Sequence, residues 1–171
     1  RYISGTEDVA NGKIGKVIGA DTFSPCSVEK THPELFWYGI HGVEILFTIM
    51  GKGVKTVSMA HTADTDVATG IWSDNRIGTF RGIRSGRSGY GGNVFGEKGI
   101  LALGNFSGYN PLLKKILEFF NTGIPPVSAE ETLDIFAFMQ AAQESMDKGG
   151  MPVDVAKVVA KASQKAKKIR L

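Results

Sequence analysis

Alternating apolar and polar positions in the first two thirds of the chain predict β-strands. Residues 13–23 alternate well enough for a strand, which Pro25 ends. Five more strand-like runs follow with short connections, at residues 54–62, 65–73, 76–84, 94–99 and 100–106. The Asp-Asn pair at residues 74–75 is typical of a hairpin turn. Consecutive strands joined in this way indicate an antiparallel sheet.

One helix is expected between the first strand and the others. The sequence "FWYGIHGVEILFTIMG" predicts a largely apolar helix from about Trp37 to Met50. The glycines of "GKG", residues 51–53, end it. The helix places His41 and Glu44 close to its start, which is unusual for a segment so suited to burial.

The last third of the chain predicts three more helices. Asn110-Pro111 begins the first, which Gly123 ends. Ser128 and Glu131 form a capping box at the start of the second. Apolar residues recur at helical spacing in the third, at positions 155, 158, 159, 162, 166 and 169. Strands first and helices later predict an α+β fold: an open, predominantly antiparallel sheet with helices packed on one face.

The open face of the sheet is expected to be an interface between copies of the chain. Val57 and Met59 lie on one alternation of their strand, but Val54 lies on the other, so both faces carry apolar residues. An apolar face without helices needs another cover. We therefore expect a homo-oligomer formed through this face.

Charge and composition restrict the class of protein. The 171 residues are 42% apolar, enough for one core. The net charge of +3 comes from residues 154–171, which carry +5 and leave −2 for the rest, so no nucleic-acid partner is expected for the domain. The single cysteine, Cys26, excludes an internal disulfide, and no apolar run has the ~20 residues of a membrane span. A cytoplasmic location is expected, although the chain begins with Arg1 and an upstream segment could carry a signal.

The glycine-rich stretch 85–93 allows two interpretations. "SGRSGYGGN" is neither G-x-G-x-x-G nor a Walker sequence, and it lies between predicted strands, so no phosphate cradle is indicated. It is a hairpin or crossing loop, or else a loop that binds anions or covers a substrate, because Arg81, Arg84 and Arg87 recur through it. No metal site is expected, since "AHTADTD" with His61, Asp64 and Asp66 matches no closed ligand set.

His41 is the best candidate for acid–base chemistry. His41, Glu44, Ile45 and Thr48 fall on one helical face. The positive end of the helix dipole disfavours a charged imidazole in the first turn, and a general base near neutral pH must be uncharged. The alternative is a half-buried histidine whose hydrogen bonds are satisfied within the protein.

Residues 1–153 resemble the C-terminal domain of the Gfo/Idh/MocA oxidoreductases, the glucose–fructose oxidoreductase and inositol dehydrogenase family. The resemblance rests on segments in family order: Arg1-Tyr2, "GKIGKVIGADTFSP", "GIHGVEILFTIMG", "YGGNVFGEKG" and "PPVSAEETLDIFAFMQAAQESMDKGGMPV". It implies a glyceraldehyde-3-phosphate dehydrogenase-like C-terminal domain that forms one wall of the substrate cleft. Residues 154–171 lie outside it, as a basic amphipathic helical tail.

The resemblance also implies a function for the complete enzyme. A Rossmann domain, absent from this chain, would bind NAD or NADP, and no cofactor is expected on the chain itself. The reaction would be hydride transfer at the CH–OH group of a sugar or polyol, with His41 as the acid/base. Trp37, Tyr38 and Glu44 would line the cleft, and Arg84 and Arg87 would contact the substrate. Without its Rossmann domain the chain should be inactive.

One departure from the family leaves an alternative open. The family commonly has an aspartate four residues before this histidine, and here that position is Trp37. Glu44 could partly replace the lost carboxylate. The alternative is a binding or assembly module that keeps the sheet but has no redox role.

Overall fold

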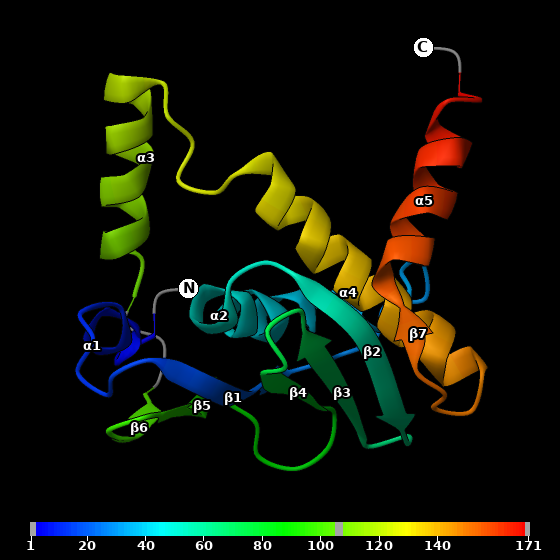
Figure 1. The fold of residues 1–171 in the computed structure, drawn as a ribbon, viewed down its shortest axis with the longest axis horizontal. Coiled ribbons are helices and arrows are strands. Elements are labelled where there is room, and N and C mark those ends of the chain that lie inside the picture. The colour runs from blue at the N-terminus through cyan, green and yellow to red at the C-terminus, as the bar shows by residue number, and fades with distance from the viewer. Residues whose placement is uncertain (1–2, 105–107, 170–171) are drawn as a thin grey trace.

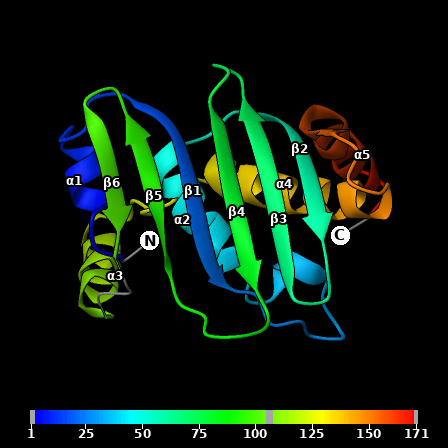
Figure 2. The ribbon, with the colours of Figure 1, turned by 90° about the horizontal axis from the view of Figure 1, so that it is seen from below.

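The computed structural model describes residues 3–104 and 108–169, and shows one sheet with its helices on one side (Figure 1). The strands are β1 (Val17–Pro25), β2 (Val54–His61), β3 (Thr65–Trp72), β4 (Ile77–Ile83), β5 (Gly91–Gly96), β6 (Gly99–Leu103) and β7 (Val153–Asp154). Their order in the sheet is β6-β5-β1-β4-β3-β2-β7. Seen from below, the sheet has no helix in front of it (Figure 2). The α+β architecture predicted from the sequence is confirmed.

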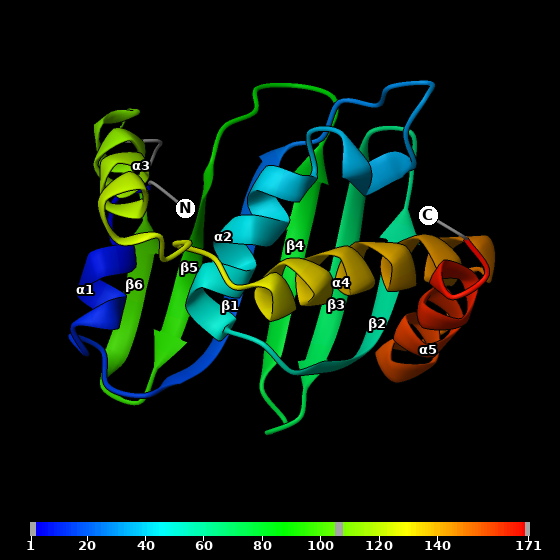
Figure 3. The same cartoon turned by 90° about the horizontal axis from the view of Figure 1, so that it is seen from above.

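Five α-helices and one 3-10 turn are described. They are α1 (Thr6–Ala10), η1 (Glu34–Phe36), α2 (Ile40–Met50), α3 (Asn110–Thr122), α4 (Ala129–Asp147) and α5 (Val155–Ala166). Helices α2 and α4 lie on the sheet (Figure 3), where Phe47, Trp72 and Phe138 form an aromatic cluster with ring centroids 5.6–6.5 Å apart. All three rings are buried and form the centre of the core.

Strand β1 is inserted between strands that are consecutive in the chain. It pairs in parallel with β4 and antiparallel with β5, and the other strand pairs are antiparallel. The segment from Arg84 to Tyr90 must therefore cross the end of β1 to reach β5. The glycine-rich stretch is thus a crossing loop, one of the two structural forms that the sequence allowed.

The register of β2 corrects one argument from the sequence. A register shift in β2, between Val54 and Thr56, turns Val54 to the same side as Val57 and Met59, and all three are buried. Val54 is therefore no sign of an apolar outer face. The outer face is nonetheless apolar in part, through exposed residues that alternate with the core: Phe23, Ile71, Ile77 and Ile100.

Helix α2 starts later than the sequence predicts. The chain forms η1, bends at Trp37 and enters α2 only at Ile40. Gly39, which follows the bend, is buried without room for a side chain, because a Cβ there would lie 3.0 Å from Cys26 Sγ and from Leu35 Cα. Trp37 and Tyr38 therefore belong to the bend before the helix and not to its first turn.

The basic C-terminal segment is helical as predicted and is attached to the domain. Val153–Asp154 pairs with β2, and the Asp154 side chain accepts a hydrogen bond from the Lys157 N–H at the start of α5. Val155 and Val158 are buried. The short strand β7 was not expected from the sequence.

Some expectations fall on residues outside the described ranges. These are the Arg1-Tyr2 pair, the end of the run 100–106 and the last two residues of the tail. Among residues 3–104 and 108–169, no helix is long and apolar enough to cross a lipid bilayer.

Candidate functional site

Gly42 lets the start of α2 pack closely against β1 and β4, and this contact decides which side of the helix faces away from the sheet. A Cβ on Gly42 would lie 2.2 Å from Phe80 Cε2 and 2.7 Å from Ser24 Oγ, so only glycine allows this approach to β1 and β4. The hydroxyl of Thr22 donates a hydrogen bond of 3.1 Å to the Gly42 carbonyl. Because this side of the helix is pressed onto the sheet, the His41 and Glu44 side chains are displayed on the exposed side.

His41 and Glu44 form an open pair. Nδ1 of His41 lies 3.5 Å from Oε2 of Glu44, and the side chains are 50% and 37% exposed. A carboxylate at Nδ1 favours the tautomer with its proton there, which leaves Nε2 of the neutral ring as the acceptor. Thr48 is exposed on the same side, and Ile45 is buried but lines the same pocket as His41 and Glu44, which agrees with the face predicted from the sequence. A residue one turn from His41 can still reach the core where the helix rests on the sheet.

A pocket of about 620 Å³ opens above this pair. Helix α2 contributes His41 and Glu44 to its lining, the N-cap and first turn of α3 contribute Tyr109 and Leu112, and the segment before α4 contributes Val127. Its size lies in the range of small-molecule sites, and it combines apolar walls with a few polar groups. The structure thus places His41, the residue predicted to be the acid/base, in the lining of a pocket of ligand size.

Tyr90 comes to this pocket on the crossing loop. Its ring centroid lies 6.5 Å from that of His41. Burial, followed by the phenols of Tyr38 and Tyr109, raises the pKa of Tyr90, so it keeps its proton at neutral pH and can donate a hydrogen bond. Tyr90 and Tyr109 were not identified from the sequence. Two signals were present for Tyr90: it lies in a loop for which a substrate-covering role was one interpretation, and it begins the segment "YGGNVFGEKG" of the family resemblance.

Trp37 and Tyr38 lie next to this pocket, in the bend before α2. The Tyr38 ring meets His41 edge-on at 5.7 Å, and Trp37 meets Tyr38 at 6.2 Å. Both side chains are exposed, at 44% and 42%. The three residues predicted around His41, namely Trp37, Tyr38 and Glu44, are thus close together.

Arg84 lies elsewhere, in a buried ionic network. Its guanidinium pairs with the fully buried carboxylate of Asp66 and, at 2.8 Å, with Glu34, and it donates to the Thr62 carbonyl at 3.0 Å. Its side chain is only 10% exposed. Arg84 thus ties the end of β4 to η1 and to the β2–β3 hairpin. Arg87 is exposed in the crossing loop. A substrate contact by either arginine stays a prediction.

The same network contains three groups that could in principle bind a metal. One ligand atom each from Glu34, His61 and Asp66 can be chosen within 4.8 Å of one another. However, the guanidinium of Arg84 already lies between the two carboxylates and supplies the positive charge. A cation there would have to displace it, so this arrangement does not suit a metal. Asp64, the third residue considered in the sequence, is exposed.

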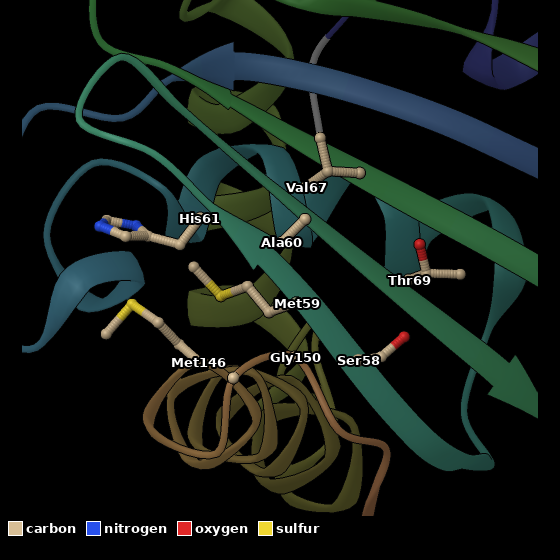
Figure 4. Close-up of a pocket in the computed structure, with 9 residues that line it drawn as sticks. Ser58, Met59, Ala60, His61, Val67, Thr69, Met146 and Gly150 are labelled. Atoms are coloured by element: carbon tan, nitrogen blue, oxygen red, sulfur yellow. The ribbon is translucent and has the colours of Figure 1, made fainter.

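A second hollow, of about 560 Å³, lies beside β2 at the end of α4. Its lining includes Met59, Met146 and Gly150, and Figure 4 shows His61 at one end, with Ser58 and Thr69 at the other. His61 Nδ1 is engaged with Asp66 Oδ1 at 2.6 Å. Because its polar groups do not converge, this hollow is a weaker candidate than the His41 pocket.

Comparisons with known proteins give likeness in structure alone. No family model matches the sequence, and no curated protein matches it. Scyllo-inositol dehydrogenase from Lactobacillus casei, with bound NAD(H) and scyllo-inositol, superposes with a TM-score of 0.69 at 16% identity, over 88% of this chain and 60% of that one. Myo-inositol 2-dehydrogenase from Lactobacillus plantarum gives 0.69 at 17%, over 87% and 60%. An oxidoreductase from Thermotoga maritima gives 0.64 at 16%, over 90% and 58%.

The structural likeness covers only part of each inositol dehydrogenase. The chain spans about 60% of the length of the first inositol dehydrogenases that it matches. At these identities the comparison shows the fold and does not transfer an activity. The fold of this chain is that of the C-terminal domain of inositol dehydrogenase-like structures.

Proposed function

We propose that this chain is the substrate-binding domain of a nicotinamide-dependent oxidoreductase that acts on the CH–OH group of a sugar or polyol. The observation that carries the proposal is the position of His41, next to Glu44 and in the lining of a pocket of about 620 Å³. The fold shared with inositol dehydrogenases supports this proposal. The same likeness supports membership in the Gfo/Idh/MocA family.

His41 would move the hydroxyl proton. Its Nε2 accepts the proton as the alcohol becomes a carbonyl, and returns it in the reverse direction. Glu44 at Nδ1 fixes the tautomer and stabilises the imidazolium that forms. This is the role of the carboxylate that the family commonly places at the position of Trp37. Tyr90, protonated at neutral pH, donates a hydrogen bond to the substrate.

The cofactor would be held outside this chain. Within residues 3–104 and 108–169, the glycine-rich loop leads into β5 and not into a helix, so it gives a pyrophosphate no helix N-terminus. In our proposal NAD or NADP, which would accept the hydride, is bound by a separate Rossmann domain. The chain alone would then have no dehydrogenase activity.

Sugar binding to the His41 pocket tests the proposal on the chain itself. The chain has three histidines, His32, His41 and His61, so their imidazole NMR signals can be assigned by single substitutions. Myo-inositol, sorbitol and glucose, at millimolar concentration, are expected to include a ligand that shifts the His41 signal and leaves His61 unchanged. The matched variant His32→Gln should keep this response. If no sugar or polyol moves the His41 signal, the proposed function is wrong.

The open face of the sheet carries exposed apolar residues that suit self-association of the chain. Self-association is compatible both with the oxidoreductase and with the alternative, an assembly module without redox function. Phe23, Ile71, Ile77 and Ile100 are exposed there by 36%, 42%, 52% and 69%. We propose that copies of the chain associate through this face, in an oxidoreductase or in an assembly module without redox function. Sedimentation velocity should show a dimer or larger species, and a monomer at high concentration would rule out self-association by this face.

A further inference from the structure

A row of five aromatic rings leads away from the His41 pocket. Consecutive ring centroids in the order His32, Trp37, Tyr38, His41 and Tyr90 lie 5.2, 6.2, 5.7 and 6.5 Å apart. Tyr90 and His41 line the pocket, whereas the other three rings lie outside its lining. We call these five residues the ring row.

The outer part of the ring row is open to solvent and held by its backbone. Trp37 and Tyr38 are 44% and 42% exposed, and His32 is exposed. The bend at Trp37 and Tyr38 is followed by Gly39, which packs against Cys26 and Leu35. The backbone that carries Trp37 and Tyr38 is therefore packed against the domain before any ligand arrives, which lowers the entropic cost of binding.

The chemistry of the ring row differs from that of the other exposed apolar surface nearby. On α3, the exposed apolar side chains carry no polar group, as in Leu113, Leu117 and Phe120. In the ring row, each ring combines an apolar face with a polar edge: an indole N–H, a phenol or an imidazole nitrogen. Sugar rings are complementary to such groups, because their C–H faces stack on aromatic rings while their hydroxyls meet polar edges.

The extent of the ring row exceeds one sugar. The pocket is lined by His41 and Tyr90, whereas Tyr38 and Trp37 lie outside this lining, at successive centroid distances of 5.7 and 6.2 Å along the ring row. A free monosaccharide or cyclitol would leave these two rings unused. A second and third unit linked to the first would cover them.

We infer that the substrate is a glycoside or oligosaccharide, with one sugar in the His41 pocket and the attached units stacked on Tyr38 and Trp37. This inference rests on the proposed function, since it extends the same site. It assigns the specificity for the attached group to Trp37, the residue that stands where the related enzymes commonly have a carboxylate.

Tryptophan fluorescence can test this directly. The chain has two tryptophans, and Trp72 is 1% exposed with its indole N–H bonded to the Gly51 carbonyl, so a ligand on the surface affects mainly Trp37. Cellobiose, maltose and lactose are titrated beside glucose and galactose, with calorimetry on the same samples. At least one disaccharide should bind about tenfold more tightly than its monosaccharide and change the Trp37 emission.

The variant Trp37→Ala separates stacking from pocket binding. It should remove the tenfold preference, measured by calorimetry, while the affinity for the monosaccharide stays within about twofold. Phe120→Ala, which removes a more exposed aromatic ring on α3 (77% against 44% for Trp37), should change neither affinity. The near-ultraviolet circular dichroism of Trp72 reports that both variants are folded.

The contrary results distinguish this inference from the proposed function. A monosaccharide that shifts the His41 signal, with no preference for a disaccharide, overturns the inference and leaves the function standing. A preference that survives in Trp37→Ala also overturns it. If neither sugar class binds and no His41 shift occurs, both proposals are wrong, and cover of the ring row by another protein becomes the better explanation.

Discussion

Two histidine–carboxylate pairs lie within residues 3–104 and 108–169, and they differ in the burial of the carboxylate. His61 lies 2.6 Å from Asp66, whose side chain is fully buried and also paired with Arg84. His41 lies 3.5 Å from Glu44, in a pair whose members are 50% and 37% exposed. A pocket of about 620 Å³ opens on the second pair, while the first ties together η1, β4 and the β2–β3 hairpin.

The difference shows what makes such a pair available for chemistry. In the buried pair, both carboxylate oxygens of Asp66 are occupied, by His61, Arg84 and the thiol of Cys26. In the open pair, His41 and Glu44 both line a pocket of about 620 Å³. Both pairs bring a histidine close to a carboxylate. The difference in role is therefore expected to depend on how accessible the pair is to a ligand and on which other groups bind its carboxylate.

Removing Asp66 should give the largest loss of stability. Asp66→Ala leaves the buried Arg84 with Glu34 as its remaining carboxylate and should lower the free energy of unfolding by about 3–5 kcal/mol. The measurement is urea unfolding followed by circular dichroism. The exposed neighbour Asp64 provides the control, since Asp64→Ala should change stability by less than about 0.5 kcal/mol. Equal effects of the two substitutions would show that the network does not stabilise the fold.

The thiol of Cys26, which is buried beside Asp66, should be almost unreactive. Burial, reinforced by the carboxylate of Asp66, raises the pKa of Cys26 from 9.0 to about 12. A raised pKa means that this thiol contributes stability below pH 9, which is lost as the pH rises toward 12. Ellman's reagent at pH 8 should therefore react with the chain in urea and not with the folded chain. A native reaction as fast as that of free cysteine would contradict the buried position.

The next largest effect concerns the glycine that presents the open pair. Gly42→Ala places a methyl group 2.2 Å from Phe80, which should cost about 1–3 kcal/mol of stability through overpacking. It should also displace the first turn of α2 and weaken ligand binding at His41. Gly99→Ala is the matched control, because its Cβ would find its nearest neighbour only at 4.0 Å. Comparable destabilisation in the two variants would refute the role of close packing at Gly42.

Most of the fold could be predicted because it depends on local patterns. The strands β2, β3 and β4 and the helices α3 and α4 follow from alternation, turn residues and caps, as the hydrogen bond from the Glu131 N–H to Ser128 Oγ shows. The insertion of β1 between β4 and β5 depends on pairing between segments more than fifty residues apart, which no local pattern reports. The same holds for the position of Val54, which a register shift decides.

The part of the candidate site that lies within one helix was predicted, and the part that depends on the tertiary fold was not. His41 and Glu44 are one helical turn apart, so their proximity follows from the sequence. Tyr90 and Tyr109 reach the pocket through the crossing loop and α3, and only the tertiary fold brings them there. Arg84 lies three residues from Arg87 in the sequence, yet it is buried while Arg87 is exposed, because Asp66 and Glu34 hold it.

The smallest effect on stability is expected from substitution of His41. Comparing it with substitution of His61 therefore tests directly whether the two histidine–carboxylate pairs differ in role. His41→Gln should change the free energy of unfolding by less than about 0.5 kcal/mol, since the side chain is half exposed. His61→Gln should cost about 1–3 kcal/mol, because it removes a short hydrogen bond from a buried carboxylate. Both variants are compared by urea unfolding.

Ligand binding should show the reverse order. His41→Gln should weaken binding of the sugar or polyol that shifts the wild-type His41 signal, whereas His61→Gln should bind it as the wild type does. Calorimetry with the same ligand gives both affinities. The two pairs differ in role only if stability depends on one and binding on the other. If His61→Gln impaired binding as much as His41→Gln, the sealed network would be part of the site, and the contrast between the two pairs would be lost.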